Sequence, residues 1–80
     1  MRVTIVRPDG FVSVDGVGFT GLDLSFIDPD IHAIQWYGTE GEIEWRVDGR
    51  KYFNTDIDGL EEFQPALDAW VAANKAAESV

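Results

Sequence analysis

The stretch IHAIQWYGTEGEIEW, from Ile31 to Trp45, decides the fold of this chain. Apolar and polar residues alternate on both sides of a glycine-bounded loop, Gly38–Gly41, which is the pattern of a β-hairpin with one buried face. On the apolar face the predicted pairs are Trp36 with Ile43 and Ile34 with Trp45. On the polar face they are Gln35 with Glu44 and Tyr37 with Glu42. The alternation therefore predicts both a register and a buried face.

The residues after the hairpin predict a third strand. Val47–Arg50 has the sequence VDGR, and Asp-Gly readily occupies both positive-φ positions of a type I′ turn. A strand over Arg50–Phe53 then pairs antiparallel with the strand before the turn. In this register Tyr52 joins the apolar face, and Phe53 lies beside Glu44 on the opposite face.

The N-terminal residues predict a further hairpin. Arg2–Val6 and Phe11–Val14 are rich in β-branched residues, and Arg7–Gly10 between them is a strong turn sequence. Asp15–Gly18 is a second turn signal. Leu22–Phe26 alternates apolar and polar residues, and we expect a short strand or an extended segment there.

The C-terminal residues predict a helix with two competing starting points. Asp58 and Glu61 resemble a capping box, but a helix from Asp58 would hold Pro65 in its interior at a cost of about 3 kcal/mol. A turn over Ile57–Phe63 followed by a helix over Gln64–Glu78 places the proline in the first turn, where it is tolerated. We therefore expect the second arrangement.

The helix has one apolar stripe, and the hairpin has one apolar face for it to cover. The stripe consists of Phe63, Leu67, Trp70, Val71 and Asn74. We expect Leu67, Trp70 and Val71 to pack on Ile34, Trp36, Ile43 and Trp45. The predicted fold is α+β: an antiparallel β-meander of about four to six short strands with one C-terminal α-helix on a sheet face. Residues 1–57 are the β-rich part of this single domain, and residues 58–79 form the turn and the helix.

The composition narrows the classes of partner. The chain has 80 residues, no cysteine and a net charge of −9, so disulfides and thiolate metal sites are excluded. The six basic residues are scattered, whereas nucleic-acid binding needs a basic stripe. No stretch is long and apolar enough for a membrane span or a signal peptide. We expect a cytoplasmic protein that binds neither nucleic acid nor membranes.

Residue types that carry chemistry are present but poorly arranged for it. The string from Asn54 to Gly59 has oxygen ligands spaced as in a calcium loop, yet Pro65 stands where that loop needs a glutamate. A turn in which Asp58 caps the following segment explains the string better. His32 is the only histidine, and a metal site with Asp28 and Asp30 is a weaker alternative to a surface position. We therefore predict no metal and no cofactor.

Catalysis by paired carboxylates is the remaining enzymatic alternative. Glu42 and Glu44 alternate on one strand and lie roughly 7 Å apart, a separation that suits glycoside hydrolysis. They are expected to face solvent, without an apolar pocket to raise either pKa. We therefore predict no catalytic residue and no enzyme.

The predicted outer face of the meander is the candidate site for protein contact. It carries two aromatic and two acidic side chains: Tyr37, Glu42, Glu44 and Phe53. Two arrangements are open for this face. Either the N-terminal hairpin covers it and its aromatics belong to the core, or it stays uncovered as an apolar patch that binds a protein.

Three stretches, DGFVSVDGVGFTGLDLSFI (Asp9–Ile27), IHAIQWYGTEGEIEW (Ile31–Trp45) and ALDAW (Ala66–Trp70), carry a resemblance. Together they resemble a group of short proteins encoded by tailed bacteriophages and prophages among tail and tail-fibre genes, described as candidate tail-fibre assembly factors. That group has no assigned functional residues, so none is transferred here. The resemblance implies a non-enzymatic protein that contacts a phage tail component, in the host cytoplasm or within the virion. The alternative is a small acidic regulator or inhibitor that mimics nucleic acid toward a host protein.

Overall fold

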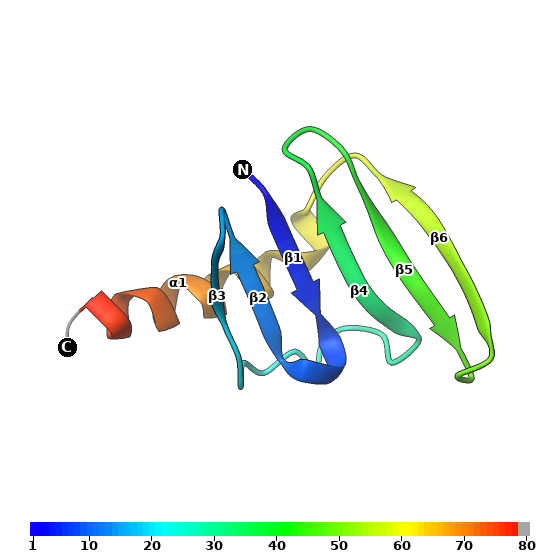
Figure 1. The fold of residues 1–80 in the computed structure, drawn as a ribbon, viewed down its shortest axis with the longest axis horizontal. Coiled ribbons are helices and arrows are strands. Elements are labelled where there is room, and N and C mark those ends of the chain that lie inside the picture. Colours follow the sequence, from blue (N-terminus) through cyan, green and yellow to red (C-terminus); the bar gives the residue numbers. More distant parts are fainter. Residues whose placement is uncertain (79–80) are drawn as a thin grey trace.

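Six strands form one antiparallel sheet, and a C-terminal helix packs on one of its faces (Figure 1). The computed structural model describes residues 1–78, so Ser79 of the predicted helical part lies outside the described residues. The elements are β1 (Val3–Val6), the 3-10 turn η1 (Arg7–Asp9), β2 (Phe11–Val14), β3 (Val17–Phe19), β4 (Ile31–Trp36), β5 (Gly41–Val47), β6 (Lys51–Ile57), the 3-10 turn η2 (Glu61–Phe63) and α1 (Gln64–Glu78). The predicted α+β class is confirmed.

The strand order β3-β2-β1-β4-β5-β6 joins two three-stranded meanders through the pair β1–β4. Ile5 lies opposite Ile34 in that pair, and both side chains are fully buried. The predicted N-terminal hairpin is confirmed as β1 and β2. It extends the sheet edge to edge and does not lie over the outer face, so the arrangement in which it covers that face is wrong.

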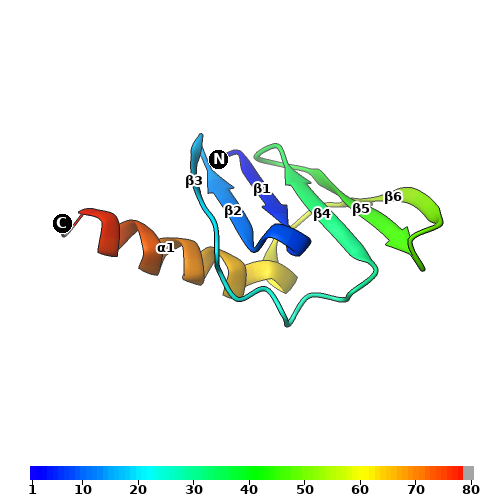
Figure 2. The same cartoon turned by 60° about the horizontal axis from the view of Figure 1, so that its bottom comes forward.

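In the N-terminal half one turn differs from the prediction, and the first of the two alternatives for residues 22–26, a short strand, is wrong. Asp15 and Gly16 alone form the second turn, with φ of 49° and 87°, so a strand resumes at Val17 where a turn was predicted up to Gly18. Residues 22–26 form no strand. The Asp23 carboxylate accepts hydrogen bonds from the Ser25 amide at 3.0 Å and its hydroxyl at 2.6 Å, which competes with extended pairing. This irregular segment passes along the core side of the sheet (Figure 2).

The central hairpin keeps its predicted faces but not its predicted pairs. Ile34 lies opposite Ile43, and Trp36 lies opposite Gly41, a shift of two residues. The loop is shorter than expected, because the Tyr37 amide still donates to the Glu40 carbonyl at 2.8 Å. A shift of two leaves every side chain on its original face. The buried face is therefore correct, although the pairs of the predicted register are wrong.

The β5–β6 hairpin reverses the predicted facing of its second strand. Asp48 and Gly49 adopt positive φ, and the Arg50 amide donates to the Val47 carbonyl at 3.0 Å, as a type I′ turn requires. Pairing nevertheless resumes only at Lys51, so one extra residue sits in the connection. A slip of one residue exchanges the two faces. Phe53 therefore lies opposite Trp45 on the core side, and Tyr52 lies on the outer face.

The helix begins and ends where predicted but covers different strands. Gln64–Glu78 is confirmed, with Pro65 in its first turn. The helix contacts β2 and β3, and the Trp70 indole donates to the Val17 carbonyl at 2.7 Å. Its ring meets Phe19 edge to face, with 6.1 Å between centroids. Packing of the helix on β4 and β5 is wrong, and Val71 is 47% exposed.

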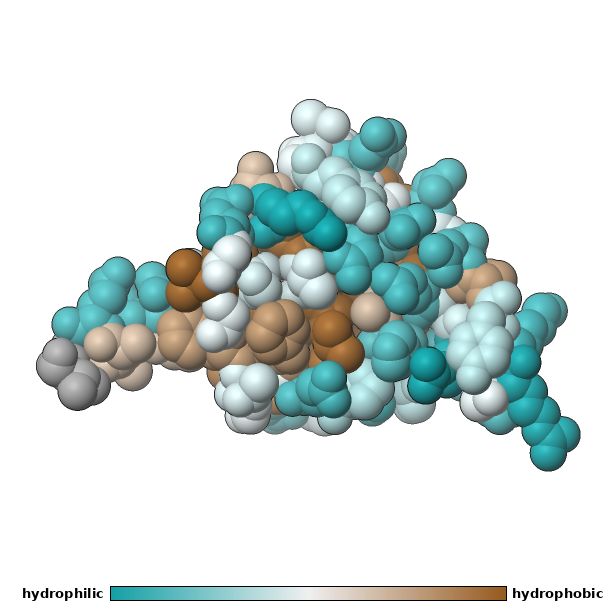
Figure 3. Space-filling view, in the orientation of Figure 1, coloured by the Kyte–Doolittle hydropathy of each residue, from teal (hydrophilic) through white to brown (hydrophobic). Residues whose placement is uncertain are grey.

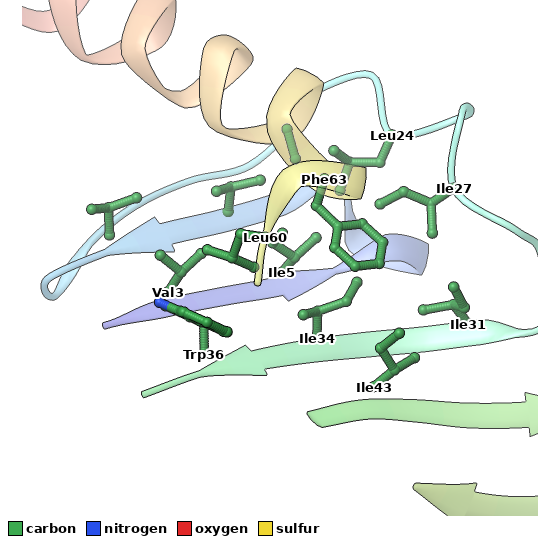
Figure 4. Packing of buried hydrophobic residues seen from close by; sticks show 13 residues of the cluster. Val3, Ile5, Leu24, Ile27, Ile31, Ile34, Trp36, Ile43, Leu60 and Phe63 are labelled. Atoms are coloured by element: carbon green, nitrogen blue, oxygen red, sulfur yellow. The ribbon is translucent and has the colours of Figure 1, made fainter. Parts of the chain in front are cut away.

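The face of β1 and β4 is closed by the segment that precedes the helix. Leu60 and Phe63 project onto this face, and the Phe63 ring points toward Ile34 (Figure 4). Leu24 from the irregular segment and Ile27, which directly follows that segment, complete the same cluster. Because these side chains occupy the centre of the sheet, the helix lies beside them over β2 and β3. Ile43 of β5 is buried in this cluster, whereas residues 51–56 of β6 are exposed beyond it.

Candidate protein-contact surface

Strand β6 is the most exposed regular element of the sheet. It forms one edge of the sheet, and all its residues from Lys51 to Asp56 are exposed. Tyr52 is 65% exposed and Phe53 is 39% exposed. Among residues 1–78 no element lies beyond this strand, and α1 lies toward the opposite end of the molecule (Figure 1). Both faces and the outer edge of β6 are therefore accessible.

The core-side face of β5 and β6 carries an aromatic pair, Trp45 and Phe53. Their rings are stacked at 5.9 Å with an angle of 9° between planes. The Trp45 indole donates to the Thr55 hydroxyl at 2.8 Å, and the Lys51 ammonium lies 5.6 Å from the Phe53 ring centroid. These contacts hold both rings in place, so the partly exposed pair is an ordered apolar surface.

The outer face holds Tyr37 between a cation and an anion. The Arg2 guanidinium lies 4.4 Å from the Tyr37 ring centroid, and it is fixed there by a hydrogen bond to the Trp36 carbonyl at 2.9 Å. The Tyr37 hydroxyl donates to the Glu42 carboxylate at 3.3 Å. Loss of surrounding water raises the pKa of Tyr37 above its usual value, the charge of Glu42 raises it further, and Arg2 partly opposes them. Tyr37 therefore stays a neutral hydrogen-bond donor near neutral pH.

An acidic groove lies next to Tyr37, where the outer face meets the end of β6. It is a wide-open hollow of about 590 Å³. Its lining is Tyr37, Glu40, Gly41, Glu42, Asp56, Ile57 and Asp58. Glu42 and Asp56 lie directly opposite each other on neighbouring strands, an arrangement of like charges that costs stability. The groove therefore concentrates negative charge that a basic group on another protein would relieve.

Figure 3 shows the outer face as two regions. Hydrophilic side chains cover β4, β5 and β6, and apolar side chains gather over the N-terminal strands. Phe11 belongs to the second region, because its ring lies over Gly18 so closely that a Cβ there would meet it at 2.6 Å. The outer face around Glu42 and Glu44 is therefore polar, and the apolar part of the β5–β6 end lies at Tyr52 and on the core side.

The structure divides the predicted contact face. Tyr37, Glu42 and Glu44 share the outer face, as predicted. Phe53 lies on the opposite face, because of the extra residue in the β5–β6 connection. The prediction missed Tyr52 on the outer face and the pair of Trp45 with Phe53 on the core side. The exposure of these side chains depends on where the Leu60–Phe63 segment and α1 pack on the sheet, and the local sequence carries no signal for that position.

The predicted alternatives for metal binding are also placed by the structure. Asn54 and Asp56 lie in strand β6, so their string does not form the loop of a calcium site. Asp58 caps no helix, because the N-cap residue of η2 is Leu60 and no side chain caps this turn, so that prediction is wrong. Among residues 1–78 no group of three or more acidic or histidine side chains is arranged to hold a metal ion, and His32 lies at a register shift of β4.

Two further observations concern the chain as a whole. Within the described residues, no helix combines the length and apolar character needed to cross a membrane. No protein-family model, curated protein or solved structure matches the chain.

Proposed function

We propose that this protein is not an enzyme and acts by contacting another protein with the β5–β6 end of its sheet. The observation that carries the proposal is the exposure of β6 on both faces and along its edge. A long uncovered edge strand attracts other chains, and monomeric proteins usually blunt such edges. The opposite edge is blunted, since β3 has three residues and packs against α1. An open edge at one end only is typical of a contact surface.

The resemblance to phage and prophage proteins names the class of partner. We infer a component of a phage tail or tail fibre, contacted during assembly in the bacterial cytoplasm or within the virion. The net charge of −9 suits this role, because it keeps free copies soluble before the partner is met. The ordered pair of Trp45 and Phe53 offers the apolar area on which a partner can be buried.

Site-specific crosslinking in cells tests the proposal. A photo-crosslinking amino acid replaces Tyr37, which lines the acidic groove without belonging to the edge of β6. The matched control replaces Val71, which has similar exposure at the far end of the molecule. Capture of tail proteins from induced or infected cells at position 37, but not at position 71, is the expected result. Equal capture at both positions, or capture of no other protein, contradicts the proposal.

The acidic groove favours a second candidate, an inhibitor that mimics nucleic acid toward a basic host protein. Its four carboxylates converge within one hollow. In the same experiment this candidate is supported by capture of a host nucleic-acid enzyme, provided that the capture is lost when Glu42 and Asp56 become amides and when salt screens the charges. Capture of tail proteins that persists in this amide variant excludes it.

A further inference from the structure

The geometry of β6 points to a second copy of this chain as the occupant of its edge. We infer that two copies pair their β6 strands antiparallel about a twofold axis at Asn54, which makes one continuous sheet from two. The inference shares with the proposed function only the β5–β6 end of the sheet. It assigns the open edge of β6 to a second copy of the chain.

The main-chain groups of β6 fix which residues can pair outward. The Arg46 amide donates to the Asp30 carbonyl at 2.7 Å, on the β4 side of β5. Neighbouring residues of a strand bond in opposite directions, so Trp45 bonds toward β6 and meets Phe53. By the same alternation, the amides and carbonyls facing the open edge belong to Tyr52, Asn54 and Asp56.

A twofold axis at Asn54 uses all of these groups. Asn54 then lies opposite Asn54 of the second copy, and Tyr52 lies opposite Asp56 of the second copy on both sides of the axis. Each of these is a hydrogen-bonded pair, in which the two residues exchange both main-chain bonds. A register shifted by one residue would instead face outward-bonding residues with residues that already bond to β5.

The charges along the strand select the antiparallel direction. Lys51 and, in the connection just before β6, Arg50 lie at one end, and Asp56 and, just after β6, Asp58 lie at the other. With the axis at Asn54, Arg50 of each copy lies opposite Asp58 of the other. Parallel pairing would place like charges together at both ends, which is unfavourable. Two copies of the segment 50–58 are therefore complementary in charge when they run antiparallel. Its two basic and two acidic residues sum to zero, although the whole chain carries a net charge of −9.

The core-side face contributes apolar contact across the axis. Phe53 lies opposite Thr55 of the second copy and is diagonal to its Phe53, a separation that aromatic side chains span. Because each Phe53 is stacked on Trp45, the dimer places four aromatic rings in one row. Contact between the two copies would bury part of the Phe53 ring surface that is exposed in the single copy.

Analytical ultracentrifugation up to millimolar protein measures the mass of the wild type and of Asn54→Pro. The proline removes only an amide that faces the open edge, a position that tolerates proline in an edge strand. We expect a dimer of the 8.9 kDa chain for the wild type, and a monomer with an unchanged circular dichroism spectrum for the variant. A wild type that stays monomeric, or a dimer that survives Asn54→Pro, overturns the inference.

Introduced cysteines test the register, because the chain contains no other thiol. Residues of a hydrogen-bonded pair have Cα atoms about 5.5 Å apart, within the range that a disulfide spans. Asn54→Cys alone should therefore form a covalent dimer on oxidation. Tyr52→Cys alone should not, but it should link to Asp56→Cys when the two are mixed. Linking of Tyr52→Cys to itself contradicts the register.

Charge reversal tests the pair at the strand ends. Arg50→Asp should raise the dissociation constant about tenfold, and adding Asp58→Arg should restore the wild-type value. Failure of the double variant to restore it contradicts the pairing. The results also separate the two proposals. A monomer that captures tail proteins through position 37 keeps the proposed function and rejects the dimer, whereas a dimer that captures no other protein does the reverse.

Discussion

The most informative perturbation of the fold compares Phe63→Ala with Val71→Ala. Both residues were predicted to belong to one apolar stripe. In the structure Phe63 is 4% exposed in the centre of the core, and Val71 is about half exposed on the helix. If the cover over β1 and β4 is the segment around Leu60 and Phe63, the two truncations must have very different costs.

The expected costs follow from burial. Removing a buried phenylalanine ring costs about 3–5 kcal/mol, and a domain of this size has a total free energy of unfolding of about 4–12 kcal/mol. Phe63→Ala should therefore remove about a quarter or more of the free energy of unfolding. Val71→Ala removes a half-exposed side chain from a helix in which alanine is favoured, so its cost should stay within about 0.5 kcal/mol.

Urea unfolding followed by tryptophan fluorescence measures both costs. The slope of the free energy against urea should be the same in the two variants and the wild type, which shows that the unfolded states are comparable. Equal costs for the two variants would refute the observed cover, since they would mean that the helix packs through Val71 as the stripe predicted. A cost for Phe63→Ala below about 1 kcal/mol would refute it as well.

Three further predictions concern the outer face and the helix. Asp56→Asn removes the like charge opposite Glu42 and should raise the free energy of unfolding by about 0.2–1 kcal/mol, measured by urea unfolding; destabilisation would contradict it. Glu42→Gln should lower the pKa of Tyr37 toward its usual value, measured by ultraviolet titration against a Tyr37→Phe blank. The raised pKa also makes the free energy of unfolding depend on pH, because the folded chain holds the Tyr37 proton more tightly than the unfolded chain. The stabilisation by the protonated Tyr37 hydroxyl is complete below the pKa of the unfolded chain, near 10. It is lost as pH rises through the folded pKa. Trp70→Phe loses the bond to the Val17 carbonyl and should cost about 0.5–1.5 kcal/mol in thermal unfolding, whereas no change would show that the bond does not fix the helix.

Elements with strong local signals could be predicted from the sequence. The start of α1 follows from Pro65, which is tolerated in the first turn of a helix but not in its interior. The N-terminal hairpin and the Asp48–Gly49 turn follow from turn residues between β-branched runs. The buried face of the central hairpin was also predictable, because an error of two residues in register leaves the alternation intact.

The candidate site was less predictable because it depends on single-residue spacing and on tertiary packing. One extra residue at Arg50 exchanged the faces of Tyr52 and Phe53, and the same turn sequence is compatible with either spacing. Tyr37, Glu42 and Glu44 were placed correctly, since their facing depends only on alternation within the central hairpin. Which of these residues stay exposed depends on where the helix packs, and periodicity describes only which side of the helix is apolar.

The uncovered end of the sheet does not result from a lack of helix. Fifteen residues make a helix about 22 Å long, and six strands span about 24 Å between the outermost strands. The helix could therefore cross most of the sheet, yet its last turns extend beyond β3 (Figure 1). The chain returns from β6 toward the centre, where Phe63 is buried, and α1 continues in the same direction toward β3. A longer helix would extend further from the sheet without covering β6, so the exposure of this strand results from the direction of α1 and not from its length.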